Sequence, residues 1–366
     1  MKQNKAYKFR IYPNEEQKII FAKTFGCTRF IYNKMLSDKI DYYQQTKQKL
    51  NNTPAQYKTE FEWLKEVDSL ALANAQMNLQ KAFTNFFNNP KSGFPKFKSK
   101  HKNRKSYTTN NQRNTITLKN GYLKLPKLVD LVRVKQHRQI PKDHKIKSVT
   151  ISQTPSGKYY ASILCEYESQ IQTVEPKTFL GLDFSMKELY VASDNTSAEY
   201  PRYFRKSQEK LAREQRKLSK CVIGSQKRNK QRLKVAKLHE KVANQRKDFL
   251  HKLSRQIANT YDCVCIEDLD MKAMSQALNF GKSVADNSWG MFTTFLKYKL
   301  EDLGKQLIKI DKWFPSSKTC SNCGNVKENL SLSDRIYHCS NCGITLNRDY
   351  NASVNIKNQG MKLVIS

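Results

Sequence analysis

Four cysteines near the end of the 366-residue chain have the spacing of a metal site. They form two Cys-x-x-Cys pairs separated by fifteen residues: Cys320 with Cys323, and Cys339 with Cys342. This spacing is typical of a zinc ribbon, in which four thiolates close a tetrahedron around one structural Zn²⁺. A redox role is the alternative, but Gly324 and Gly343, directly after each pair, favour the tight turns of a metal site. Because a closed site has no position for a substrate, the reactive chemistry must lie elsewhere.

Three carboxylates are candidates for that chemistry. Asp183 interrupts the apolar run Phe179–Phe184, which predicts a buried strand, and a carboxylate there is costly unless it is paired or binds a metal. Glu267 ends a second apolar run, and Asp349 opens a helix seven residues after the last cysteine. Mg²⁺ prefers oxygen ligands, and two Mg²⁺ about 4 Å apart serve phosphodiester hydrolysis well. The trio therefore predicts a metal-dependent nuclease in which the same three acids are the catalytic residues and the Mg²⁺ ligands.

The residues alone leave two of these assignments open. Asp268 and Asp270 lie beside Glu267, and the alternation along the strand does not decide which acid points inward. Asp349 also suits the first turn of a helix, where acidic residues are favoured for structural reasons. Its position just after the cysteine pairs is what favours a functional role.

The charge balance indicates a polyanionic partner. Lys and Arg total 66 against 32 Asp and Glu, and the formal net charge of +34 extends over the whole length. Contacts between cations and phosphates release counterions, so nucleic acid fits this surface better than a membrane does. We find neither an apolar stretch of membrane-spanning length nor a signal-type segment after Met1, and the unpaired cysteines suit a reducing compartment. We therefore expect a soluble, intracellular protein.

Periodicity in the first 174 residues predicts a β domain with helices inserted into it. Residues 4–12 alternate as a strand, residues 15–88 have apolar residues at helical spacing, and residues 115–167 form short strands with a hairpin at Pro155–Gly157, typical of a small barrel. Between residues 88 and 114, cations alternate with rings, which predicts a loop that contacts nucleic acid, with a solvated linker as the alternative. The candidate nucleic-acid contacts are Lys96, Lys98, Lys100, Arg104, Tyr107, Asn111, Gln112 and Arg113.

The rest of the chain predicts an α/β domain around the acids. Strands are expected at residues 179–184, 188–193, 262–267 and 306–313, and helices at 204–259 with a break at 224–225, at 289–303 and at 348–357. Ligands gather at the carboxyl ends of strands in open α/β sheets, which is where Glu267 lies. A ribonuclease-H-like sheet has an acid in its first strand, one at the end of a later strand and one opening a late helix, and this order is found here. The lysine-rich helix pair favours contact with nucleic acid.

Several motifs make the chain resemble the TnpB family, RNA-guided nucleases encoded by insertion sequences and related to the compact type V CRISPR effectors. The motifs extend over nearly the whole chain: Lys5–Asn14, Gly93–Phe97, Gly181–Asp183, Ile266–Leu269, Phe314–Cys320 and Asn347–Asn355. The resemblance implies a RuvC-like active site formed by Asp183, Glu267 and Asp349, and it selects Glu267 over its acidic neighbours. Two departures bear on local geometry: Asn347 where many relatives have Asp, and Phe184–Met186 where many have a glycine.

The resemblance also implies a domain organisation and a set of partners. A wedge-like β-barrel would cover residues 1–14 and 89–174, with a helical recognition lobe over 15–88 inserted in it. A RuvC-like nuclease domain would cover 175–315 and 343–366, interrupted by a zinc ribbon over 316–342. The expected cofactors are two catalytic Mg²⁺, one structural Zn²⁺ and a guide RNA from the transposon end. The expected target is double-stranded DNA beside a short motif, read by residues 69–81 and 107–113, and the protein is expected to act as a monomeric ribonucleoprotein.

The function predicted from the sequence is therefore an RNA-guided, Mg²⁺-dependent DNA endonuclease of an insertion sequence, with a single site that cuts both strands. Two alternatives belong to other classes. One is an RNA-guided repressor that binds DNA without cutting, against which the intact acids argue. The other is a transposase proper, which would recognise transposon ends without an RNA cofactor.

Overall fold

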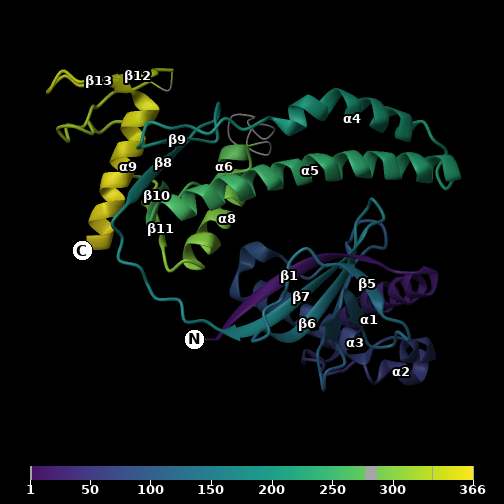
Figure 1. Cartoon of the computed structure of the whole chain (residues 1–366). Coiled ribbons are helices and arrows are strands. Elements are labelled where there is room, and N and C mark those ends of the chain that lie inside the picture. Colours follow the sequence, from purple (N-terminus) through teal and green to yellow (C-terminus); the bar gives the residue numbers. More distant parts are fainter. Residues whose placement is uncertain (1, 277–286, 332, 366) are drawn as a thin grey trace. The chain divides into compact units, whose positions relative to one another are not determined.

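The computed structural model describes residues 2–276, 287–331 and 333–365, which divide into two compact units between Gln170 and Ile171 (Figure 1). Both units combine helices with β-sheet, which confirms a mixed α/β fold. Residues 277–286, which fall within the predicted nuclease domain, lie outside the described residues. In the part of the chain that is described, no helix is both long and apolar enough to cross a bilayer.

The first unit is built on one antiparallel sheet of seven strands. They are β1 (Lys2–Tyr12), β2 (Lys105–Asn110), β3 (Thr117–Lys119), β4 (Tyr122–Lys124), β5 (Val132–Lys135), β6 (Lys145–Gln153) and β7 (Tyr159–Glu168). Their order is β2-β6-β7-β1-β5-β4-β3, so β1 lies in the middle of the sheet between β7 and β5. The predicted hairpin is confirmed, because Gly157 takes a positive φ of 85° in the turn between β6 and β7.

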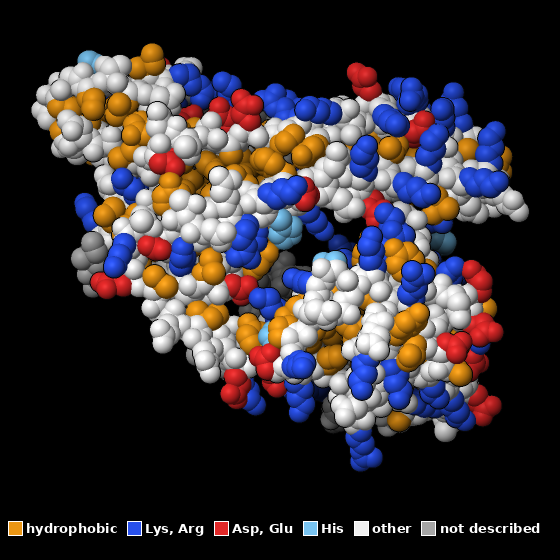
Figure 2. Space-filling view, viewed as in Figure 1, with side chains coloured by type: hydrophobic (Ala, Val, Ile, Leu, Met, Phe, Trp, Pro, Cys, Tyr) orange, Lys and Arg blue, Asp and Glu red, His pale blue; other side chains and the backbone are white. Residues whose placement is uncertain are grey.

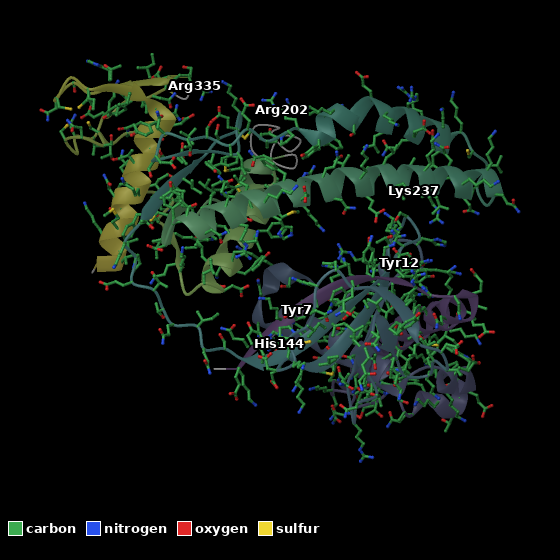
Figure 3. All side chains as sticks on the ribbon, in the orientation of Figure 1. Tyr7, Tyr12, His144, Arg202, Lys237 and Arg335 are labelled. Carbon is green, nitrogen blue, oxygen red and sulfur yellow. The ribbon has the colours of Figure 1, made fainter. Side chains whose placement is uncertain are left out.

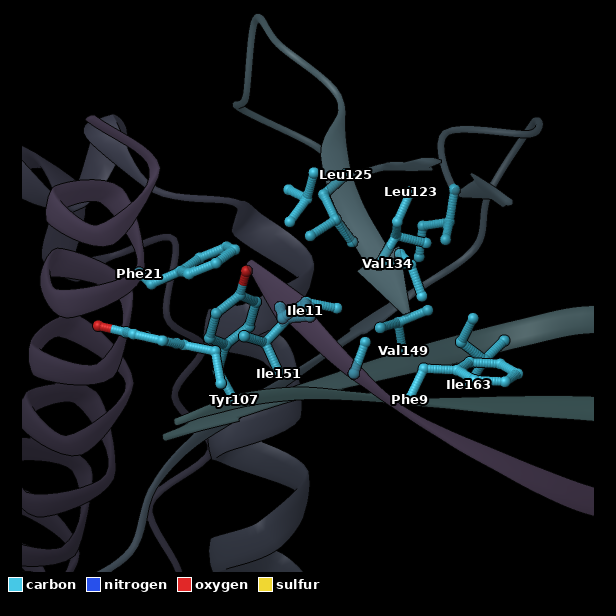
Figure 4. Packing of buried hydrophobic residues seen from close by; sticks show 14 of the residues in the cluster. Phe9, Ile11, Phe21, Tyr107, Leu123, Leu125, Val134, Val149, Ile151 and Ile163 are labelled. Carbon is cyan, nitrogen blue, oxygen red and sulfur yellow. The ribbon is translucent and has the colours of Figure 1, made fainter. Parts of the chain in front are cut away.

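Helices inserted between β1 and β2 cover one face of this sheet. They are α1 (Glu15–Thr46), α2 (Tyr57–Glu60) and α3 (Ser69–Asn88), with 3₁₀ turns at Glu62–Glu66 and Pro90–Ser92. Alternate residues of β1, including Phe9 and Ile11, point into a core that also contains Phe21 of α1 (Figure 4). Asn14 begins α1 by accepting a hydrogen bond from the Gln17 backbone N–H at 2.8 Å.

Part of the segment predicted to be a nucleic-acid-contacting loop is a strand, so the loop prediction is wrong for residues 105–110. Strand β2 pairs with β6 from Lys105 opposite Gln153 to Asn110 opposite Ser148. Tyr107 and Thr109 are buried, whereas the flanking residues are more exposed. The high content of Lys, Ser, Thr and Asn concealed this period of two, because only one face of an edge strand needs to be buried.

The second unit has a four-stranded sheet with helices on both faces (Figure 1). Its strands are β8 (Phe179–Phe184), β9 (Tyr190–Ala192), β10 (Cys263–Glu267) and β11 (Gln306–Ile310), in the order β11-β10-β8-β9. β10 is parallel to β8 and to β11, and β9 is antiparallel to β8. One face packs against α5 (Gln226–Thr260) and α8 (Trp289–Glu301), and the other against α9 (Arg348–Ile365). The unit also contains the helices α4 (Tyr203–Ser219) and α6 (Met271–Gln276), and a two-stranded sheet of β12 (Ile336–His338) and β13 (Thr345–Asn347).

Two glycines let α9 lie unusually close to the sheet. A methyl group on Gly181 of β8 would lie 2.7 Å from the backbone N of Lys357 and closer still to the carbonyl O of Ser353. On α9 itself, Gly360 faces Cys265 of β10, with no room for a side chain between them. The helix that begins with Arg348 and Asp349 therefore runs directly over the strands that carry Asp183 and Glu267.

We expect Gly181→Ala to lower the free energy of unfolding by about 1–3 kcal/mol, because the added methyl group must push α9 away from β8. Urea unfolding of the full chain, followed by circular dichroism, measures this change. The matched control is Gly290→Ala in α8, where an added methyl group meets no atom within 4 Å and the loss should be absent. Equal unfolding midpoints for the two variants would contradict the close approach.

Candidate metal centres in the second unit

The strand register places Asp183 and Glu267 side by side. Leu182 of β8 is paired with Ile266 of the parallel strand β10, so the next residues along, Asp183 and Glu267, are neighbours at the carboxyl ends of both strands. Adjacent strands lie about 4.8 Å apart, and paired residues point to the same face. That face is the one covered by α9, because Gly181 and Cys265 lie two residues before the acids and both contact the helix. Both carboxylates are partly buried.

Asp349 reaches the same place from the first turn of α9. The side chain of Asn347 begins this helix by accepting hydrogen bonds from the backbone N–H groups of Asp349, at 2.9 Å, and Tyr350, at 3.1 Å. An asparagine oxygen caps a helix as well as a carboxylate does. Asn347 can therefore begin this helix as the Asp of many relatives would. Arg335 lies 4.0 Å from the Asp349 carboxylate across the start of the helix.

Asp183 lies within the electrostatic influence of the other two acids. Burial raises the pKa of Asp183 well above its ordinary value, and the charges of Glu267 and Asp349 raise it further, while Arg348 opposes them. Burial also raises the pKa of Glu267, and the Ser316 hydroxyl, which donates a hydrogen bond to its carboxylate, opposes that shift. Three acids at one place repel one another when ionised, and bound cations would relieve that repulsion. The neighbouring Asp268 instead forms an ion pair with Lys309, at 2.6 Å.

The four cysteines meet in a compact cluster whose dimensions fit zinc. The Sγ atoms of Cys320 and Cys342 are 3.6 Å apart, as are those of Cys323 and Cys339, and all four lie within 4.8 Å of one another. A tetrahedron with Zn–S bonds of about 2.3 Å has edges of about 3.8 Å. Within the described ranges, this is the one such compact group of cysteine, histidine or acidic ligands.

The two cysteine pairs form two similar turns. Gly324 donates its N–H to the Cys320 carbonyl at 2.9 Å, and Gly343 does the same to Cys339 at 3.0 Å, each glycine with a positive φ near 75°. Backbone N–H groups that point at the sulfurs lower the pKa of Cys323, Cys339 and Cys342, whereas burial raises the pKa of Cys320 to about 11. Donors that stabilise thiolates are what a four-thiolate site needs.

Asparagines that the sequence analysis did not single out join this cluster to α9. The side chain of Asn351 accepts a hydrogen bond from the Ser321 backbone at 2.9 Å and donates one to the Thr319 carbonyl at 2.7 Å. Asn355, one turn later, donates to the carbonyls of Ser316 at 2.8 Å and Thr319 at 2.6 Å. Both side chains are buried. Two polar residues four apart among the apolar positions of a helix are the sequence signal that could have found them.

The predicted nucleic-acid contacts of the first unit are split between a cleft and the core. Lys98, Lys100 and Arg104 line a cleft of about 320 Å³ together with residues of α1 and α3. Tyr107 borders the same cleft, but its ring lies in the core 5.8 Å from that of Phe25, which leaves little of it for stacking on a base. Asn111 uses its side chain to hold a turn, whereas Lys96, Gln112 and Arg113 are exposed. Four of the eight predicted residues therefore line the cleft, together with residues of α1 and α3.

Two cationic surfaces add to these contacts. In the second unit, α4 and α5 form a hairpin with seventeen Lys or Arg residues against four acids, and blue side chains crowd its visible face (Figure 2). In the first unit, the outward face of β1 pairs cations with rings, where the Arg10 guanidinium lies 4.9 Å from the centre of the Tyr12 ring. Figure 3 shows Tyr12 near one end of that sheet, and Tyr7 near the other, where its hydroxyl is 3.1 Å from His144 Nδ1. The alternation of residues 4–12 predicted the strand but not this surface, because the cations and rings that meet on it include side chains from other strands.

Fold and site together define a two-unit α/β protein whose acid trio adjoins a four-cysteine cluster. The structure of a Cas12f1–sgRNA–target DNA complex has a protein chain with this fold, with a TM-score of 0.63 at 15% identity, over 98% of this chain and 99% of that one. A candidate RNA-guided DNA endonuclease of Streptomyces pristinaespiralis is 34% identical over 98% of this chain and 89% of its own length. A second, InsQ of Escherichia coli K12, is 30% identical over 97% of this chain and 92% of its own length.

Family models match three segments. The IS605 OrfB model, described as a probable transposase, matches residues 162–278, and the Cas12f1-like TNB domain matches 289–356. A helix-turn-helix model of the same OrfB family matches residues 1–48, which here form strand β1 and the single long helix α1. The chain belongs to the TnpB family, as its motifs predict.

Proposed function

We propose that this protein is an RNA-guided, Mg²⁺-dependent DNA endonuclease of an insertion sequence, which cuts target DNA beside a short motif at a single RuvC-like site. The observation that carries the proposal is the convergence of Asp183, Glu267 and Asp349, from two strand ends and one helix start, with a raised pKa at Asp183. A buried carboxylate is costly without a cation beside it, and bound divalent ions would remove that cost at Asp183.

The three acids would hold two Mg²⁺, which supply an activated water and positive charge at the leaving oxygen of a phosphodiester. The chain's own residues fix where this happens. β8 and β10 set the separation of Asp183 and Glu267, and the Asn347 cap sets the direction from which Asp349 approaches. Magnesium keeps several waters and needs few protein ligands, so three carboxylates would be enough to hold it beside a substrate phosphate.

The partners we propose are a guide RNA from the transposon end and double-stranded target DNA. The names of the relatives support this, as do the formal charge of +34 and the cationic α4–α5 hairpin. In the first unit, the sheet would serve as the wedge-like domain and the inserted helices as the recognition lobe, with the cleft around Lys98 facing DNA. The cysteine cluster would bind one structural Zn²⁺ within a ribbon inserted in the nuclease domain.

Co-expression with the flanking transposon end tests the proposal. We expect a discrete RNA to copurify, and the complex to cut a randomised target library beside one short motif with Mg²⁺ and not with EDTA. An RNA-bound complex that binds targets without cutting them would favour the repressor. Strand transfer that survives ribonuclease treatment would favour the transposase, which the description of the OrfB family model keeps as the second candidate.

A further inference from the structure

The carboxylate of Glu267 is harder to hold in one position than that of Asp183, because its side chain is longer. Strand β10 fixes its backbone, but a glutamate side chain has three rotatable bonds, and ordering it costs roughly 1.5–2 kcal/mol in side-chain entropy. The shorter Asp183 loses less freedom. A metal ligand of this kind binds tightly only when something else in the protein holds its carboxylate in place.

Ser316 supplies that support. Its hydroxyl donates a hydrogen bond to Oε1 of Glu267, which leaves Oε2 available for a cation. Ser316 is 4% exposed, so water competes little for this contact. It lies in the loop between β11 and the first cysteine pair, four residues before Cys320.

Helix α9 in turn fixes Ser316. The Asn355 side chain donates to the Ser316 carbonyl at 2.8 Å and to the Thr319 carbonyl at 2.6 Å, so it holds both ends of the turn between them. Asn355 is 5% exposed, and a buried amide that lost these partners would be left unsatisfied at a cost of about 1–3 kcal/mol. The helix that presents Asp349 therefore also determines, through Asn355 and Ser316, where the Glu267 carboxylate lies.

We infer that Ser316 is a positioning residue for Glu267, held by Asn355, and that this chain of contacts sets how tightly the acid trio binds its divalent ions. The inference rests on the proposed nuclease function, and it adds two residues that are not themselves ligands. It accounts for a buried serine and a buried asparagine that stand outside both the acid trio and the cysteine cluster.

Manganese titration of the purified full chain, followed by electron paramagnetic resonance, tests the inference. Manganese binding that the wild type shows and Asp183→Asn lacks is assigned to the acid trio. We expect Ser316→Ala to raise the dissociation constant of that site by about 10–100-fold. Cleavage by the RNA-bound variant should be slow at limiting Mg²⁺ and recover as Mg²⁺ is raised, because weaker binding is overcome by concentration. Zinc content should not change.

Two further variants separate positioning from packing. Ser316→Thr keeps the hydroxyl and should retain most of the wild-type affinity for manganese. Ser353→Ala removes a different buried hydroxyl, which lies in α9 and donates to the Tyr350 carbonyl of the same helix, and it should leave manganese affinity unchanged. Unchanged manganese affinity in Ser316→Ala would overturn the inference, as would a Thr variant as weak as the Ala variant. If Ser316→Ala loses zinc or fails to fold, the manganese affinity of Ser316→Thr becomes the test: affinity near that of the wild type supports the inference, and a large loss overturns it. Cutting by Asp183→Asn would instead reject the proposed function itself.

Discussion

Asp183→Asn is expected to abolish DNA cleavage, by about 10³-fold or more, while guide-RNA and target binding persist. An amide is the same size as a carboxylate but has no charge to hold a divalent cation, and the transition-state stabilisation that such a cation supplies amounts to several kcal/mol. Single-turnover cleavage and filter binding of the RNA-loaded variant measure the two effects separately.

The same substitution should stabilise the metal-free protein. The pKa of Asp183 in the folded chain lies well above its unfolded value of about 3.9, so between these two values the folded state binds more protons than the unfolded state does. Stability is therefore lost as the pH rises through this window, and the penalty is fully present above the folded pKa. Asp183→Asn removes the penalty, so its melting temperature at pH 7.5 should exceed that of the wild type. Each kcal/mol of unfolding free energy that is recovered should raise the melting temperature by about 2–4 °C. The gain should shrink as the pH falls towards about 4.

Asp268→Asn is the matched control. This acid stands next to Glu267, yet it pairs with Lys309 at the surface. We expect near wild-type cutting and no gain in stability. A loss of cleavage equal to that of Asp183→Asn would show that the wrong acid at the end of β10 has been assigned to the site.

The adjacency of the strands that carry Asp183 and Glu267 could be predicted from the sequence, because a general rule connects the apolar pattern to position in the sheet. Apolar runs that end in Asp183 and Glu267 predict adjacent strands, and the carboxyl ends of parallel strands meet at one edge of a sheet. The register, which decides that Glu267 and not Asp268 adjoins Asp183, depends on backbone pairing along the whole strand. No local pattern encodes that pairing.

Other features were hidden because their residue types are ambiguous. Strand β2 is rich in Lys, Ser and Asn, which usually indicate loops, and only its pairing with β6 makes it a strand. Asn351 and Asn355 look like ordinary polar helix residues until the segment they hold is folded against them. The position of β1 at the centre of its sheet follows from long-range pairing with both β5 and β7.

The cysteine cluster should be indispensable to the fold of residues 316–347. Its hydrophobic core consists of Cys320, Tyr337 and Cys339, with Ile344 packed beside them, which is too little apolar area to offset the entropy of ordering the segment. Strands β12 (Ile336–His338) and β13 (Thr345–Asn347) pair over only three residues each. Structural zinc contributes about 10–16 kcal/mol of apparent binding free energy at neutral pH in comparable sites.

We therefore expect Cys320→Ser to reduce the zinc content from about one ion per chain to none, and to make this segment sensitive to limited proteolysis. Cleavage should be lost as well, although all three acids remain. The reason is that Asn351 and Asn355 hold α9 to the loop that begins at Ser316, and that loop is anchored by Cys320. Elemental analysis, proteolysis and cleavage assays measure the three effects.

Cys221→Ser is the control, because Cys221 lies in the turn between α4 and α5, about 100 residues before the cysteine cluster. Its thiol donates to the Lys217 carbonyl at 3.2 Å, a contact that a serine hydroxyl can also make. It should keep its zinc and cut normally. If Cys320→Ser lost its zinc and still cut at the wild-type rate, the cysteine cluster would be independent of the acid trio, and α9 alone would have to hold Asp349 in place through its close packing on Gly181.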